Sequence, residues 1–297
     1  MVEPTTFGFD EQTAVTNTFQ RHSTDTSEQV TRLALNEFNQ YVATLRAHDI
    51  TVLTFRDTSA TPKPNAVFPN NWFTTWPDGT VYLYPMATPS RRAERTSNAL
   101  DLLRDTFTVH KVDDLSDTEG RGLFLEGTGV LVFDHAARVV YGCISPRCDQ
   151  SLLLQHAQTL GYTPLAFQAF DHAGTAIYHT NVMLGVQTKT AVLYSSGITN
   201  SAEKIAVIQS LKKSGREIID ITAEQLAAFC GNILNVCNRH GEPFVVLSQT
   251  AFDAFTPNQR TVLAQSGTLL PVAIPTIEAI GGGSARCMLA EIFLAPK

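Results

Sequence analysis

The stretch EGTGVLVFDHAARVVYGC, residues 126–143, contains the pattern that decides the fold of this 297-residue chain. It begins with a small and polar cluster, continues as an apolar strand, turns at polar residues and ends in a second strand. This order of features occurs five times, the last time in truncated form. The other copies are PNNWFTTWPDGTVYLYP from 69, HTNVMLGVQTKTAVLYSS from 179, GNILNVCNRHGEPFVVLS from 231 and GGGSARCMLAEIFLA from 281.

The copies recur at a near-constant period. One anchor can be taken from the polar cluster of each, and successive anchors are 55, 53, 53 and 55 residues apart. A supersecondary unit repeated in this way marks a closed or stacked repeat architecture. Five units of about 54 residues account for nearly the whole chain, so we expect residues 1–297 to form one domain. The anchors are Asn71, Glu126, His179, Asn232 and Cys287.

Helical and strand patterns alternate along the chain, which indicates an α/β fold. In the first helix we expect Val30, Leu33, Leu35, Phe38, Tyr41, Val42 and Leu45 to form the apolar face, with Asp25 and Glu28 as a capping box. Thr222 and Gln225 have the same capping spacing. We expect helices at 28–47, 96–106, 148–160, 201–214, 222–230 and 257–265, and strands at 51–55, 130–133 and 244–247.

Composition excludes several classes of function. A formal net charge of −6 argues against general binding to nucleic acid or to acidic membranes. No apolar run approaches the roughly 20 residues that a membrane span needs, and the start does not resemble a secretory signal. We therefore expect a soluble, cytoplasmic protein without a metal or other cofactor, either monomeric or a homodimer.

The five cysteines fit neither a zinc site nor a disulfide framework, because their spacings are C-x4-C and C-x6-C. Cys143, Cys230 and Cys237 lie in apolar runs and are expected to be buried. Cys287 differs, because it follows the glycine-rich segment 281–286, along which a ligand could approach the thiol.

Equivalent positions of a closed ring of repeats face one axis, so the polar clusters should converge in a central channel. Three of these clusters contain Cys287, His179 and Glu126. Together they can form a nucleophile, a general acid–base and a carboxylate that orients the base or accepts a substrate N–H. Arg286 would favour the thiolate if its side chain turned toward the site. Backbone N–H groups of 281–284 could stabilise an oxyanion.

The segments GluGlyThrGly at 126, HisThrAsn at 179 and ArgCysMet at 286, in this order, resemble the pentein superfamily of guanidino-group-modifying enzymes. The resemblance covers the whole chain. With PheProAsnAsnTrpPheThrThr at 68, it is strongest to the bacterial citrulline utilization hydrolases, also described as arginine-deiminase-related or amidinotransferase-like. It implies a five-bladed α/β propeller of ββαβ modules in which Cys287 attacks the central carbon of a small amino-acid substrate. His179 would then move protons, and Glu126 would bind substrate nitrogens.

Two positions depart from the deiminases of this superfamily. Those enzymes have an aspartate where this chain has Asn71, and another where it has Asn181. Without these charges, burying a guanidinium in the site would cost several kcal/mol, because its positive charge would have no counter-charge. An amide offers both a donor and an acceptor, which suits a neutral ureido group. We therefore expect citrulline to be hydrolysed to ornithine, ammonia and carbon dioxide.

Other interpretations stay open at this point. Arg147 resembles the arginine that holds the substrate α-carboxylate in deiminases, whereas Asn232 is interpreted as structural. Segments 57–68, 84–96 and 114–122 are candidate lids. The alternative functions are a guanidinium-acting deiminase, dimethylarginine hydrolase or amidinotransferase, and a non-catalytic pentein binding protein. The first group would need an acid near the site, for which Glu3, Asp10 and Glu278 are candidates.

Overall fold

Four of the five repeated units each form a three-stranded sheet in the computed structural model, which describes residues 1–59 and 61–297. The α/β fold expected from the sequence is confirmed. The strands are β1 (Phe73–Thr75), β2 (Thr80–Leu83), β3 (Lys111–Asp114), β4 (Val132–Asp134), β5 (Val139–Cys143), β6 (Thr163–Phe167), β7 (Leu184–Val186), β8 (Thr190–Leu193), β9 (Glu217–Asp220), β10 (Leu234–Cys237), β11 (Pro243–Ser248) and β12 (Thr268–Val272).

All four sheets have the same topology. The first strand of a unit pairs with the second in an antiparallel hairpin, and the second then pairs with the third in parallel after a helical crossover. A parallel pair needs such a crossover, because the chain must return to the starting edge. The middle strands are apolar and buried on both faces, as in VVLS of β11. The repeat inferred from the sequence is therefore a ββαβ unit in these four sheets.

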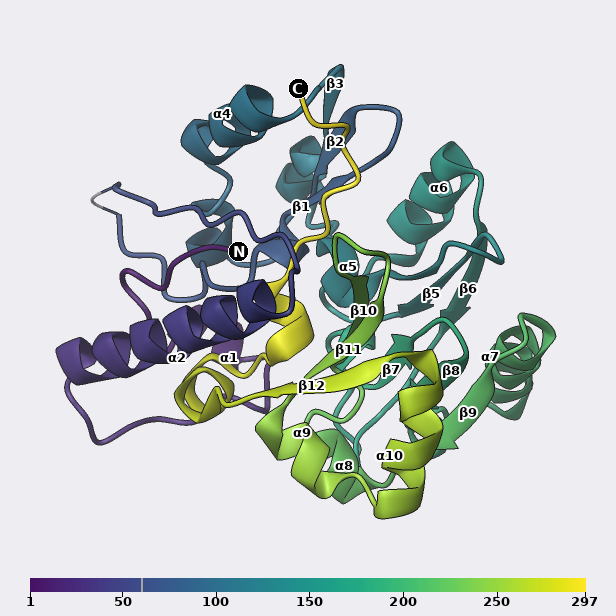
Figure 1. Ribbon diagram of the computed structural model, residues 1–297. Helices are drawn as coiled ribbons and strands as arrows, with labels where there is room; N and C mark the ends of the chain where they lie inside the picture. Colours follow the sequence, from purple (N-terminus) through teal and green to yellow (C-terminus); the bar gives the residue numbers. More distant parts are fainter. Residues whose placement is uncertain (60) are drawn as a thin grey trace.

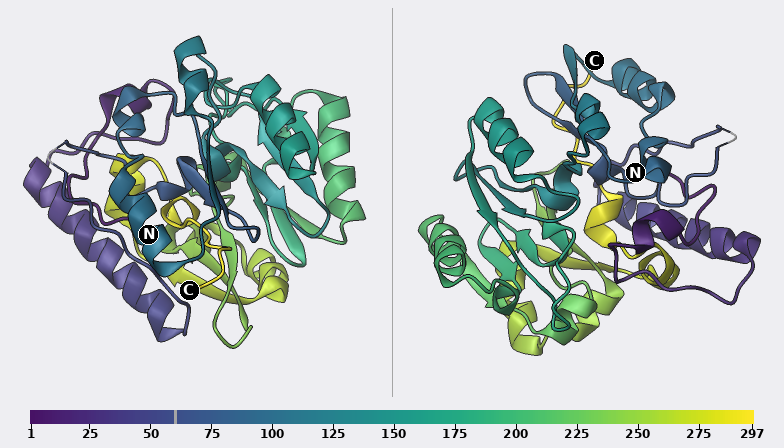
Figure 2. Two further views of the ribbon diagram at one scale, coloured as in Figure 1. Left: turned by 90° about the horizontal axis from the view of Figure 1, so that it is seen from above. Right: turned by 180° about the vertical axis from the view of Figure 1, so that it is seen from behind.

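The sheets follow one another in chain order around the middle of the molecule (Figure 1). The longer helices lie on the outside, whereas the short α5 and the turn Ala285–Met288 lie centrally (Figures 1 and 2). No helix among the described residues is long and apolar enough to cross a membrane. The helices are α1 (Glu11–Ala14), α2 (Ser27–Ala47), α3 (Pro89–Arg92), α4 (Ser97–Thr106), α5 (Gly127–Val130), α6 (Gln150–Leu160), α7 (Ser201–Lys213), α8 (Ala223–Ala227), α9 (Gln249–Ala254) and α10 (Pro257–Leu263).

Helix α2 covers the side of the molecule that carries no sheet (Figure 1). It buries Val30, Ala34, Phe38, Tyr41, Val42 and Leu45 at helical spacing. The prediction was wrong for Leu33, which is 40% exposed because it falls outside this stripe. The capping box joins Thr26 and Gln29 rather than Asp25 and Glu28, whereas the box at Thr222 and Gln225 is confirmed.

The fifth unit departs from the expectation. Residues 51–55 are not a strand and form a single β-bridge, between Phe55 and Val2. A five-bladed propeller and a single domain over 1–297 therefore stay predictions.

Two local expectations were wrong. The strand expected at 130–133 begins only at Val132, because Val130 belongs to α5. Cys237 is exposed, contrary to expectation, because it ends the edge strand β10.

A buried ion pair joins the second and third units. Arg216, which precedes β9, lies 2.6 Å and 2.9 Å from the carboxylate oxygens of Asp134 at the end of β4. The Arg216 side chain is 6% exposed and that of Asp134 is 0% exposed, and Arg216 Nε also donates to the Gln187 carbonyl. Removing one member of such a pair leaves an uncompensated charge in the interior.

We expect Arg216→Met to lower the free energy of unfolding by about 3–5 kcal/mol, as measured by urea denaturation. The double variant Arg216→Met/Asp134→Leu should lose less, because no unpaired carboxylate stays buried. Arg104→Met is the matched control, since Arg104 pairs with Asp101 on the surface, where such pairs contribute about 1 kcal/mol or less. Equal losses for the two single variants would contradict the role of burial.

Candidate active site

The polar clusters at the start of the units meet at one small cavity. Glu126 caps α5, His179 precedes the 3₁₀ turn Thr180–Val182, and Cys287 lies in the turn Ala285–Met288. All three residues are at most 3% exposed. The cavity is lined by Thr13, Asn17, Asn65, Phe68, Asn71, Arg91, Arg147, Tyr178, His179, Gly281, Gly282, Gly283 and Cys287.

Glu126 and His179 form a buried acid–base pair. The Nε2 atom of His179 lies 2.8 Å from Glu126 Oε2, and the backbone N–H of Ala87 donates to Oε1. Burial alone would raise the pKa of Glu126, but the charge of Arg147 and the bond from His179 hold it well below its usual range. Burial lowers the pKa of His179 to about 4, against the opposing effect of Glu126. At neutral pH His179 is therefore an uncharged imidazole that donates its Nε2–H to a carboxylate, which leaves Nδ1 as a base.

Two amides hold the sulfur of Cys287. Asn232 Nδ2 lies 3.1 Å from Sγ and Asn181 Nδ2 lies 3.5 Å from it. Asn232 Oδ1 also accepts from the backbone N–H groups of Arg286 and Cys287, so one side chain fixes both the sulfur and its peptide. N–H donors directed at sulfur stabilise a thiolate. Asn232, interpreted as structural from the sequence, is thus part of the site.

The side chain of Arg286 does not turn toward the thiol, so the condition for its assistance is not met. Its guanidinium donates to the Leu289 carbonyl and pairs with Glu291 at 3.0 Å, on the opposite side of the turn from the cavity. The side-chain donors that reach the sulfur are the amides of Asn181 and Asn232.

Asn71 faces a cation rather than an acid. Its Oδ1 accepts from Arg91 Nη1 at 2.9 Å, and its buried Nδ2 has no hydrogen-bond partner among the described residues. Arg91 also binds both carboxylate oxygens of Glu94, at 2.7 Å and 2.8 Å. Because Arg91 can only donate, it orients the Asn71 amide with Nδ2 as the free group. Burial raises the pKa of Glu94 to about 7, against the charge of Arg91.

Arg147 reaches the cavity but its donors are in use. Nη1 lies 3.4 Å from Glu126 Oε2, while Nη2 donates to the Thr13 carbonyl and to Thr16 Oγ1. Its guanidinium also lies 4.9 Å from the centre of the Tyr178 ring. A substrate carboxylate that bound Nη2 of Arg147 would have to replace its contacts to Thr13 and Thr16.

Two glycines let the polar groups approach. A Cβ on Gly129 would lie 2.3 Å from Asn71 Nδ2 and 2.9 Å from the His179 ring. Gly282 has a φ of +63° and a Cβ there would lie 2.6 Å from Asn17 Nδ2. Larger residues at either position would displace the site or strain the backbone.

The cavity is small. About 10 Å³ is open to the centre of a water-sized molecule, which is room for roughly one water. Asn17 Nδ2 donates to the carbonyls of Gly281 and Gly282, and Tyr178 Oη donates to Gly282, so these bonds hold the glycine segment at the cavity wall. Of the candidate lids, 57–68 and 84–96 supply lining residues, although residue 60 lies outside the described part of the chain. Segment 114–122 supplies none.

The three acids considered from the sequence do not line the cavity. Glu3 lies 3.6 Å from Arg56, Asp10 accepts from Asn65 and Ser90, and Glu278 accepts from Ser284 and Thr250. The charged residues of the lining are Arg91 and Arg147, with the Glu126 carboxylate behind His179. In residues 1–59 and 61–297, no group of three or more His, Cys, Asp or Glu could hold a metal ion.

Sequence reasoning missed four parts of the site: Arg91, Tyr178, Asn232 and the segment 13–17. Arg91 had a signal in the i, i+3 spacing to Glu94. Asn232 had one in its repeat position. Nothing in the sequence placed residues 13–17 over the cavity, because they precede the first sheet by more than 50 residues.

Comparison with known families gives one match over nearly the whole chain. Residues 3–294 match the family described as N,N dimethylarginine dimethylhydrolase, eukaryotic. No sequence among curated proteins matches significantly.

Solved structures of similar fold agree with this match. ArgZ, described as an arginine dihydrolase of the ornithine–ammonia cycle in cyanobacteria, is 15% identical, with a TM-score of 0.73 over 98% of this chain and 40% of that one. Its N-terminal domain bound to product is 16% identical, with a TM-score of 0.74 over 99% and 97% of the two chains. A dimethylarginine dimethylaminohydrolase variant in an adduct with S-methyl-L-thiocitrulline is 13% identical, with a TM-score of 0.62 over 87% and 88%. This chain thus spans less than half of full-length ArgZ, and at these identities the likeness shows the fold alone.

We expect alkylation to separate Cys287 from the buried thiols once the exposed Cys237 is removed. Burial raises the pKa of Cys143 and Cys230 to about 12 and raises that of Cys148 as well. In Cys237→Ser, iodoacetamide at pH 7.5 should therefore modify Cys287 first, as mapped by peptide mass spectrometry. The alkylation rate of Cys287 should rise in the additional variant Asn17→Ala, which removes the hydrogen bonds to the carbonyls of Gly281 and Gly282. Faster labelling of Cys143, Cys148 or Cys230 would contradict this arrangement.

Proposed function

The chain belongs to the family described as N,N dimethylarginine dimethylhydrolase, eukaryotic. From this premise we propose that it is a pentein hydrolase acting on non-peptide C–N bonds, and that it hydrolyses the ureido group of citrulline. The products are ornithine, ammonia and carbon dioxide. Cys287, His179 and Glu126 are the proposed catalytic residues, and Asn71, Asn181 and Arg147 the proposed substrate-binding residues. The five-unit propeller belongs to the same proposal.

The proposed reaction has two halves, of which the second uses water. Neutral His179 takes the proton of Cys287, and the thiolate attacks the ureido carbon to form a C–S bond. His179 then returns the proton to the departing nitrogen as the C–N bond breaks, which leaves a thiocarbamate on Cys287. A water molecule next loses a proton to His179 and attacks the same carbon, and the C–S bond breaks. The released carbamate decomposes, so that one water and one citrulline give the three products.

The free Nδ2 of Asn71 is the observation that favours a ureido substrate over a guanidinium. Arg91 fixes the orientation of this amide, so the group left for a ligand is a buried donor that lacks a partner among the described residues. A ureido oxygen can accept from it, whereas a guanidinium consists only of donors and would leave it unpaired. The cavity lining contains two arginines and no acid. It therefore disfavours a cationic substrate side chain and favours the α-carboxylate of an amino acid.

Arginine is the second candidate substrate, through deimination followed by ureido hydrolysis at the same thiol. The Glu126 carboxylate behind His179 is the observation that favours it, since it is charged at neutral pH and could compensate a guanidinium. The similarity in fold to ArgZ is in keeping with this candidate.

The two candidates differ in the substrate consumed and in the amount of ammonia released, since arginine would release twice as much ammonia per ornithine as citrulline. We expect citrulline to give ornithine, ammonia and carbon dioxide in equal amounts, and arginine and dimethylarginine to react much more slowly. Chromatographic analysis of the amino-acid products checks this, with Cys287→Ala as the inactive control. Faster consumption of arginine would replace the first candidate by the second, and equal activity of Cys287→Ala would end the proposed mechanism.

Asn71→Asp tests the donor directly. An ionised aspartate only accepts, so it would face the ureido oxygen with a second acceptor beside it. We expect kcat/KM for citrulline to fall by roughly 30-fold or more, which corresponds to about 2 kcal/mol. The ratio of arginine to citrulline turnover should rise, because the new charge favours a cation. Glu94→Gln is the comparison, since it alters the same Arg91 network without touching this donor. An unchanged ratio in Asn71→Asp would contradict the assignment.

A further inference from the structure

Glu278 is a buried carboxylate at the start of the glycine-rich segment. It belongs to the π-helical turn Ile277–Gly281 and is 5% exposed. Its carboxylate accepts from Ser284 Oγ at 2.6 Å and from Thr250 Oγ1 at 2.7 Å. Turns of π-helical form are rare and are frequent at functional sites. Glu278 thus joins the segment that leads to Cys287 to α9, the helix that contains Thr250.

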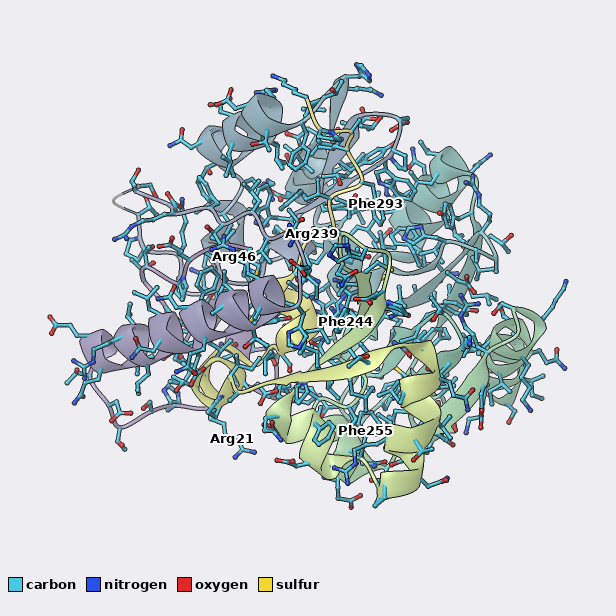
Figure 3. The ribbon with its side chains drawn as sticks, in the orientation of Figure 1. Arg21, Arg46, Arg239, Phe244, Phe255 and Phe293 are labelled. Carbon is cyan, nitrogen blue, oxygen red and sulfur yellow. The ribbon has the colours of Figure 1, made fainter. Side chains whose placement is uncertain are left out.

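No cation balances the Glu278 carboxylate in the described part of the chain, and its side-chain donors are hydroxyl groups. Arg21 donates its backbone N–H to the carbonyl of Ala279, next to Glu278, but the Arg21 side chain is exposed at the edge of the molecule (Figure 3). Burial raises the pKa of Glu278, although the hydrogen bonds from hydroxyl groups oppose this. A buried acid without a counter-charge costs free energy, and such groups are typical of functional sites.

Ser284 connects Glu278 to the proposed nucleophile. Its hydroxyl donates to the carboxylate, and its carbonyl accepts the backbone N–H of Cys287 at 2.9 Å. Ser284 directly precedes the turn Ala285–Met288 and has no exposed surface. The hydrogen bond that fixes the Ser284 side chain therefore also restricts the residue whose carbonyl holds the Cys287 peptide.

Two backbone N–H groups of the same segment have no acceptor among residues 1–59 and 61–297. They belong to Gly283, which lines the cavity, and to the fully buried Ser284. Unpaired buried N–H groups are rare in folded proteins. In the proposed reaction negative charge develops on the ureido oxygen, and a free N–H donor at the cavity can stabilise it. The segment provides this donor only while it keeps its position.

We propose that Glu278 is a positioning residue for the reaction. Through Ser284 it holds the Cys287 thiol and the N–H of Gly283 at the cavity. Through Thr250 it anchors this segment to the fourth unit. Glu278 does not line the cavity, so it acts on the reaction only through these neighbours. The proposal rests on the proposed role of Cys287 as nucleophile, and it does not depend on the choice between citrulline and arginine.

Two variants each remove one hydroxyl from the same carboxylate. Ser284→Ala breaks the connection to Cys287, whereas Thr250→Val breaks the connection to α9 and is the matched control. With citrulline as substrate, we expect Ser284→Ala to lower kcat by roughly tenfold or more and to change KM by less than about twofold, because the substrate-binding residues are untouched. Thr250→Val should lower kcat clearly less.

Variants of Glu278 separate its position from its charge. A glutamine can still accept from Ser284 and can donate to the Thr250 hydroxyl, so Glu278→Gln should keep most of the wild-type kcat. Glu278→Ala should lower kcat as much as Ser284→Ala does. The double variant Glu278→Ala/Ser284→Ala should lie within about twofold of either single variant, because residues that act as a unit are not additive.

Amide hydrogen exchange tests the same connection without a substrate. In Ser284→Ala the amides of 283–287 should exchange at least about tenfold faster than in the wild type, whereas those of β11 should not change. Ser284→Ala decides the outcome even if Glu278→Ala unfolds, because it removes a single hydroxyl.

Two results would overturn the proposal: unchanged exchange at 283–287 in Ser284→Ala, or equal losses of kcat in Ser284→Ala and Thr250→Val. If the wild type leaves citrulline intact, the proposed function fails instead, and the exchange at 283–287 still decides whether Glu278 holds the segment.

Discussion

A carboxylate with no contact to solvent is the constraint on which the site depends. Glu126 is charged and fully buried, so its charge must be balanced inside the protein. Arg147 balances it from the far end of the same unit, and His179 donates to it from the next unit. Arg147 in turn binds the carbonyl of Thr13 and the hydroxyl of Thr16. One buried charge thus fixes a base, a cation and the N-terminal segment relative to one another.

Repetition made much of this predictable. The period near 54 residues identified Glu126, His179 and Cys287 as neighbours. In the structure His179 and Cys287 line one cavity, and Glu126 contacts His179 from behind it. The period also identified Asn71 and the family resemblance identified Asn181, although the sequence indicated neither of their contacts. Asn71 binds Arg91 and Asn181 lies beside the thiol. Such pairings are set by side-chain directions, which a period does not contain.

The fifth unit was the least predictable part of the fold, for a physical reason. Its segments come from distant parts of the chain, so no local hairpin signal joins them. ThrValLeuThrPhe at 51–55 has strand propensity without an adjacent partner in the sequence. A β-propensity becomes a strand only when another strand supplies its hydrogen bonds. The exposed Cys237 has the same origin, because its apolar neighbours suggested burial whereas β10 is an edge.

The small size of the cavity affects whether a covalent intermediate on Cys287 would react with water or with a second amine. Transfer to a second amine requires that a molecule larger than water reach the carbon on Cys287 while the intermediate lasts. Asn17 and Tyr178 hold the glycine turn over the thiol and leave space for about one water. A cavity of this size favours water over a larger amine as the second reactant. The partition between hydrolysis and group transfer would then be decided by the N-terminal segment, which carries none of the proposed catalytic groups.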